Sequence, residues 1–123
     1  MAADITSEKL DRVFGALADN TRRSILKKVQ TEAVTVVELA SDFHISLPAV
    51  SKHLKILENA GLLKREKKGR FIHCKYYPQT MEAAVKWISD QHQFWNESFN
   101  SLEKFLAKSN QPVIQKYAKR KKR

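Results

Sequence analysis

The sequence predicts a mainly α-helical fold with one small β-hairpin and a long C-terminal helix. Apolar residues recur at intervals of three and four over most of the chain, which is the spacing of amphipathic helices. Residues 71–77 instead alternate with a period of two, as in a β-strand. The chain has 123 residues, and we expect one domain over residues 1–110 and a basic, disordered tail over residues 111–123.

Two helices are expected in the first 30 residues. The segment SEKLDRVFGALADN places four apolar side chains on one helical face, namely Leu10, Val13, Phe14 and Leu17. The segment DNTRRSILKKVQ predicts a second helix, because Asp19 or Asn20 is able to accept hydrogen bonds from the free N–H groups of its first turn. The apolar stripe of this second helix consists of Ile25, Leu26 and Val29.

Residues 35–60 predict two helices joined by a short turn. Thr35 and Glu38 form a capping box, in which each side chain accepts a hydrogen bond from the other residue's backbone N–H. Ser46 is a second N-cap, and Pro48 is tolerated in the first turn, where N–H groups have no helical acceptor. Gly61 is suited to the left-handed conformation that ends a helix.

A basic β-hairpin follows directly. The segment LLKREKKGRFIHCKYYP contains two strand-like runs around KKGR, and Gly69 supplies the turn. In the second run Ile72, Cys74 and Tyr76 share one face. A hairpin directly after two such helices is the arrangement of a winged helix-turn-helix.

The last predicted helix is long and rich in aromatic residues. After Pro78 an apolar stripe continues for about 27 residues, which is more than a domain of this size is able to cover. One alternative is that this helix folds back over its own domain. We favour a homodimer, whose predicted interface contains Leu10, Phe14, Trp87, Ile88, Phe94, Trp95, Phe99, Leu102 and Leu106.

The charge distribution favours a polyanionic partner. The net charge is +10, and residues 44–75 contain eight Lys or Arg residues against two acids. In a helix-turn-helix the second helix enters the major groove of duplex DNA. The expected contacts to bases and phosphates come from this helix and the hairpin: Leu47, Pro48, Ser51, Lys52, His53, Lys55, Lys67, Lys68 and Arg70. The alternatives are a solvated amphipathic helix, or a winged-helix module that binds protein or RNA.

Three ordered segments resemble the ArsR/SmtB-type winged-helix repressors of bacteria: ALADNTRRSIL, TVVELASDFHISLPAVSKHLKIL and ENAGLLKREKKGRFIHCKYY. The resemblance covers roughly residues 8–78, with Asn20 in place of the usual proline. It implies a homodimeric repressor, built chiefly on the first and last helices, that binds an operator with two-fold symmetry. A cytoplasmic location is expected from the single cysteine, which permits no intrachain disulfide. The C-terminal segment is similar to a subgroup related to autorepressors rather than to metal sensors.

No metal, cofactor, small-molecule substrate or membrane partner is predicted. The helix at residues 36–43 has no cysteine, and the only cysteine, Cys74, is expected to be a buried structural thiol. A metal- or redox-responsive repressor that uses Cys74, or Asp90 and His92, remains an alternative. The chain has no glycine-rich phosphate loop, nucleophile elbow or metalloprotease motif, so we do not expect an enzyme.

Overall fold

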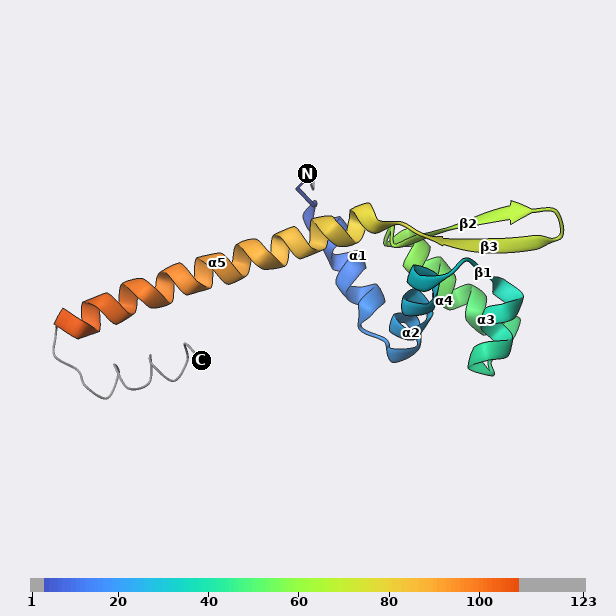
Figure 1. Cartoon of the computed structure of the whole chain (residues 1–123), viewed down its shortest axis with the longest axis horizontal. Helices are drawn as coiled ribbons and strands as arrows, with labels where there is room; N and C mark the ends of the chain where they lie inside the picture. Colours follow the sequence, from blue (N-terminus) through green and yellow to red (C-terminus); the bar gives the residue numbers. More distant parts are fainter. Residues whose placement is uncertain (1–3, 109–123) are drawn as a thin grey trace. The chain divides into compact units, whose positions relative to one another are not determined.

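Five α-helices and three β-strands follow one another within residues 4–108, the part of the chain that the computed structural model describes (Figure 1). Their bounds are α1 Ser7–Leu17, α2 Asn20–Thr31, β1 Val34–Thr35, α3 Val36–Phe43, α4 Leu47–Asn59, β2 Leu63–Lys68, β3 Phe71–Tyr76 and α5 Pro78–Lys108. The predicted fold class, a mainly helical winged helix-turn-helix with a long last helix, is confirmed. The chain divides into two structural units, Met1–Lys86 and Trp87–Arg123, so α5 begins in the first unit and continues into the second. The expected basic tail lies outside the described residues.

The helix starts follow the predicted capping residues. Asp19, not Asn20, is the N-cap of α2, and its carboxylate accepts a hydrogen bond from the backbone N–H of Arg22 at 3.0 Å. This hydrogen bond lowers the pKa of Asp19. The capping box of Thr35 and Glu38 is present at the start of α3, and Ser46 caps α4 through the backbone N–H of Ala49. Local sequence therefore sets the starts of α2, α3 and α4.

The three strands form one antiparallel sheet in the order β1-β3-β2. The strands β2 and β3 pair over their full length, from Leu63 opposite Tyr76 to Lys68 opposite Phe71. They are joined by a two-residue loop, Gly69 and Arg70, with the positive φ of 63° at Gly69 that a tight hairpin turn requires. The KKGR turn expected from the sequence is thus shorter, because both of its lysines belong to β2.

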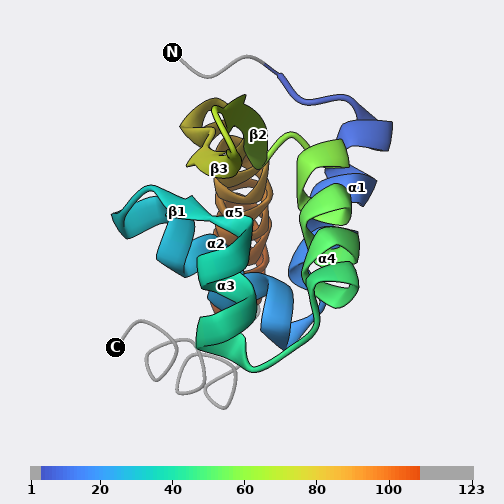
Figure 2. The same cartoon turned by 90° about the vertical axis from the view of Figure 1, so that its right-hand side faces the viewer.

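The core of the first unit lies between the helices and the sheet. The helices α1 and α2 both contact α4, and α4 contacts α3 and β2 (Figure 2). The buried apolar side chains include Leu10, Val13, Ile25, Leu39, Val50, Leu54, Leu57, Leu62 and Cys74. Ala16 is buried on α1 where the sequence suggested Phe14, whose side chain is 40% exposed. Leu10 is only 9% exposed, so it belongs chiefly to the core of its own protomer and not to a free surface.

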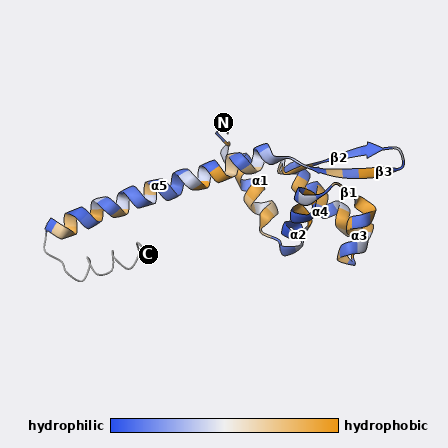
Figure 3. Cartoon of the chain, in the orientation of Figure 1, coloured by the Kyte–Doolittle hydropathy of each residue, from blue (hydrophilic) through white to orange (hydrophobic). Residues whose placement is uncertain are grey.

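The helix α5 has 31 residues and begins at Pro78, because proline is tolerated at the first helical position. Within the first unit, Ala84 is buried in the core and Met81 packs against that core. From Trp87 to Lys108 no side chain is classed as buried, and only Phe99, Glu103 and Leu106 are partly covered. Apolar and polar residues alternate along this part of the helix in Figure 3. None of the helices in residues 4–108 is both long and apolar enough to cross a membrane.

Candidate nucleic-acid interface

The helix α4 presents two different faces. Val50, Leu54 and Leu57 are buried against the core of the first unit. On the other side of the helix the structure exposes every predicted contact residue of α4 except His53, namely Leu47, Pro48, Ser51, Lys52 and Lys55. The exposed set lies in the first two and a half turns, where the N-terminal part of a recognition helix meets base edges. The exposed face of α4 therefore lies where a recognition helix would present its contact residues.

The side chain of His53 does not belong to this exposed face. Its Nδ1 atom lies 4.0 Å from Oδ2 of Asp19, and the side chain is 24% exposed. A residue two positions after Ser51 is rotated about 200° around the helix, which turns it toward α2. We therefore remove His53 from the predicted set of DNA contacts and assign it to the junction between α2 and α4.

The hairpin supplies a second group of exposed cations. Lys67 and Lys68 lie at the end of β2, and Arg70 lies in the two-residue loop. All three side chains are exposed. A short two-residue loop places the cations of the turn at the tip of a paired ribbon, where they are free to contact phosphates.

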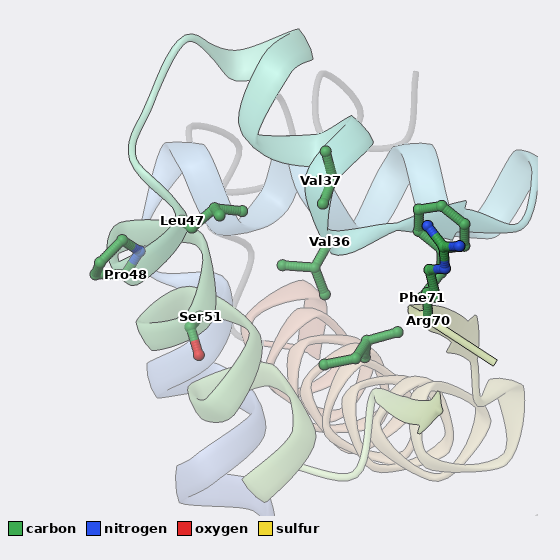
Figure 4. A pocket seen from close by; sticks show the side chains of 8 residues that line it. Val36, Val37, Leu47, Pro48, Ser51, Arg70 and Phe71 are labelled. Atoms are coloured by element: carbon green, nitrogen blue, oxygen red, sulfur yellow. The ribbon is translucent and has the colours of Figure 1, made fainter. Parts of the chain in front are cut away.

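An apolar pocket lies between the start of α3, the start of α4 and the hairpin (Figure 4). Its volume is about 350 Å³, and its lining comprises Val36, Val37, Leu47, Pro48, Ser51, Arg70, Phe71 and Ile72. Four of these residues belong to the predicted DNA contacts, so the pocket is part of the same surface. Strand alternation predicted that Ile72 shares a face with the buried Cys74, but Ile72 is exposed and lines this pocket.

Arg65 and Glu58 form an ion pair next to Ser51 that was not predicted from the sequence. The guanidinium of Arg65 donates to Glu58 Oε1, with the Nη2–Oε1 distance at 3.0 Å, and the Arg65 backbone N–H donates to Oε2 at 3.1 Å. Arg65 Nη1 also donates to Ser51 Oγ at 3.4 Å. Burial raises the pKa of Glu58, but the hydrogen bonds from Arg65 outweigh burial, so the net effect lowers this pKa. A signal was present in the sequence, because strand alternation places Arg65 on the same face as the buried Leu63.

Cys74 is a buried thiol, as predicted. It is 1% exposed, and burial raises its pKa to about 11, which keeps the sulfur protonated at neutral pH. No group of three or more His, Cys, Asp or Glu side chains in residues 4–108 is arranged to hold a metal ion. The side chains of Asp90 and His92 are exposed, and His92 Nε2 lies 3.2 Å from Asn96 Nδ2.

These features define the protein as a winged helix-turn-helix protein with a basic surface over α4 and the hairpin of β2 and β3. Residues 19–65 match the family described as bacterial regulatory protein, arsR family. The chain is 32% identical over 93 residues to the transcriptional repressor SdpR of Bacillus subtilis, which covers 76% of this chain and all of that protein. The chain thus belongs to the ArsR family of bacterial regulatory proteins.

Solved structures agree with this assignment. An ArsR-like transcriptional regulator from Rhodococcus sp. RHA1 is 26% identical and superimposes with a TM-score of 0.74 over 80% of this chain and 92% of that chain. The homodimeric winged helix-turn-helix DNA-binding domain of a possible ArsR-family regulator from Mycobacterium bovis, solved in solution, is 23% identical. It has the same fold, with a TM-score of 0.58 over 75% of this chain and 93% of that chain.

Proposed function

We propose that this protein is a sequence-specific transcriptional repressor that binds a two-fold-symmetric DNA operator as a homodimer. The observation that carries the proposal is the exposed face of α4, where Ser51 and Lys52 stand beside the apolar Leu47 and Pro48. The nearby wing adds cations, and the combination of polar, apolar and basic groups suits a DNA groove. The family relative named as a transcriptional repressor supports the same direction of regulation.

Each exposed residue has a proposed role. Ser51 and Lys52 contact base edges, since hydroxyl and ammonium groups are able to hydrogen-bond acceptors in the major groove. Leu47 and Pro48, at the edge of the apolar pocket, contact thymine methyl groups. The phosphate contacts come from the remaining cations: Lys55, Lys67, Lys68 and Arg70.

The proposed dimer rests on α5. Phe94, Trp95 and Leu102 are 67%, 62% and 52% exposed, which is unusual for apolar side chains of this size on one helix. A second copy covers such a surface most simply, because a two-fold axis pairs the same patch with itself. The proposed interface also includes Trp87, Ile88, Phe99 and Leu106 of α5 and Phe14 of α1, with Leu10 as a largely buried support.

The chain organisation follows from this proposal. Residues 1–110 form the DNA-binding domain with its dimerisation helices, and residues 111–123, with six Lys or Arg residues, add phosphate contacts that do not depend on base sequence. The family and its relatives are regulators, and we propose that this chain has no catalytic activity. Its site of action is the bacterial cytoplasm, which contains the DNA.

Selection of bound sites from random duplex DNA tests the proposal directly. We expect a palindrome with half-site centres about one helical turn apart. The Ser51→Ala, Lys52→Ala double variant should lose affinity for this site by on the order of 1–3 kcal/mol per base contact. The matched control is Lys27→Ala, which removes an exposed lysine from α2 and should leave binding unchanged. Enrichment of no duplex sequence would instead favour the alternative, a winged-helix module that binds protein or RNA.

A further inference from the structure

One arginine connects the wing to the helix that is proposed to read the bases. Arg65 lies in β2, and its guanidinium reaches two side chains of α4, Glu58 and Ser51. The side chains of Arg65 and Glu58 are 23% and 33% exposed, so the pair is partly shielded from water. Glu58 accepts from both the backbone and the side chain of Arg65, which restricts the positions that the guanidinium is able to adopt.

The contact with Ser51 has a chemical direction. An arginine side chain carries only hydrogen-bond donors, so in this pair the Ser51 oxygen must be the acceptor. A serine hydroxyl has one proton of its own, and that proton remains available to donate elsewhere. An acceptor on DNA is able to receive that proton without disturbing the contact with Arg65, whereas a donor on DNA would have to share the Ser51 oxygen with the positively charged guanidinium.

We propose that Arg65 is a specificity-determining residue that makes Ser51 a hydrogen-bond donor toward the operator. The proposal rests on the proposed function and deepens it. The base that Ser51 reads then presents an acceptor in the major groove: guanine O6 or N7, adenine N7, or thymine O4. Cytosine itself presents only the N4 amino donor in the major groove, so at a C·G pair the acceptor is O6 or N7 of the guanine on the other strand. Arg65 itself acts through Ser51 and through the fixed position of the wing, without touching the base.

Affinity measurements on a panel of operators test this assignment. The selected operator is varied to all four bases at each position of both half-sites, and binding is measured for the wild type, Ser51→Ala, Arg65→Met and the double variant. Ser51→Ala identifies the base position that Ser51 reads, because the preference there should fall by about 5- to 150-fold. Arg65→Met should weaken the base preference at that same position. The double variant should lose no more of this base preference than Ser51→Ala alone.

Two controls separate specificity from folding. Lys64→Met changes the neighbouring exposed residue of β2 and should leave every base preference unchanged. Arg65→Lys keeps the charge but replaces the planar fork with a single ammonium group, so it should restore the preference only in part. Thermal unfolding of each variant shows whether the fold is retained.

Three outcomes would overturn the inference. An Arg65→Met variant that loses the same factor of affinity on every operator has only a structural role. A wild-type affinity that does not change when the acceptor atoms of the base pair identified by Ser51→Ala are removed one at a time, as 7-deazapurines remove N7, contradicts the donor assignment, and this result does not require any Arg65 variant to fold. If the losses of base preference caused by Ser51→Ala and Arg65→Met add up in the double variant, the two residues act independently. Failure of the wild type to bind any duplex would refute the proposed function itself, and is distinguishable from these three results.

Discussion

Replacement of Trp95 with Glu should convert the protein into a monomer. Trp95 is 62% exposed and lies seven residues, or about two helical turns, before Leu102, which is 52% exposed. A buried tryptophan removes up to about 250 Å² from water, so its exposed part corresponds to about 150 Å². A two-fold axis buries this area twice, about 300 Å² in all.

The energy follows from that area. At roughly 25 cal/mol per Å², the two tryptophans contribute about 7 kcal/mol to association when fully covered. Partial coverage of half this area still leaves about 4 kcal/mol, or close to a thousandfold in the dimer dissociation constant. Glutamate removes this apolar surface and places two like charges in the proposed dimer interface. The loss of association free energy should therefore be at least as large as that of half coverage.

Sedimentation of the wild type and the variant at low micromolar concentration measures the change. The protomer mass is 14.2 kDa, so monomer and dimer are easily resolved. Operator binding should be lost with the dimer, although no DNA-facing residue is altered. The control is Asn100→Glu, which introduces the same charge about 140° around the helix from Trp95. A wild-type chain that sediments as a monomer and still binds its operator tightly would refute the dimer and its link to DNA binding.

Four other predictions concern the first unit. The log–log salt slope of DNA binding should be roughly −5 to −9 for the dimer, and substitution of Lys67 and Lys68 with Ala should reduce its magnitude by about 3 to 4, because two phosphate contacts are lost per protomer; an unchanged slope would exclude these lysines as contacts. Uracil in place of operator thymine should weaken the wild type, while Leu47→Ala should abolish this difference, as fluorescence anisotropy would show; equal binding of both operators by the wild type would contradict the methyl contact. Cys74, with its pKa raised to about 11, should resist iodoacetamide in the folded protein at pH 7, and micromolar zinc, cadmium or arsenite should not release the DNA; rapid alkylation or stoichiometric metal-dependent release would disprove this. Because the pKa of Glu58 is lowered from its ordinary value of 4.5, its carboxylate stabilises the fold above that pH, and this stabilisation disappears as the pH falls through the lowered pKa. The free energy of unfolding, measured in urea from pH 7 to pH 3, should therefore fall more steeply for the wild type than for Glu58→Gln. Identical pH profiles for the two proteins would argue against this role of Glu58.

Local signals in the sequence were sufficient for most elements of the first unit. The helix starts at Asp19, Thr35 and Ser46 depend on side chains that bond to N–H groups only three positions away. The turn at Gly69 depends likewise on a single positive φ. Such interactions require no knowledge of the rest of the chain, so they were predictable.

The features that escaped prediction depend on distant parts of the chain. The strand β1 has only two residues, and its pairing of Val34 with Cys74 spans a long stretch of sequence that leaves no periodic signature. The burial of Ala16 depends on which face of α1 packs against α4, and no spacing of apolar residues within α1 indicated it. The orientation of His53 toward Asp19 was not predictable either, because it depends on how α2 and α4 pack together.

Both strands of the wing are attached to the helix-turn-helix. On one side, Arg65 of β2 is bound to Glu58 of α4. On the other side, Thr35, the capping residue of α3, pairs with His73 of β3. Two attachments on opposite edges of the sheet restrict movement of the hairpin relative to the recognition helix. We expect a duplex that does not match their spacing to bend or twist to fit, and we therefore expect the operator to be selected also by how easily its sequence deforms at base steps that no side chain touches.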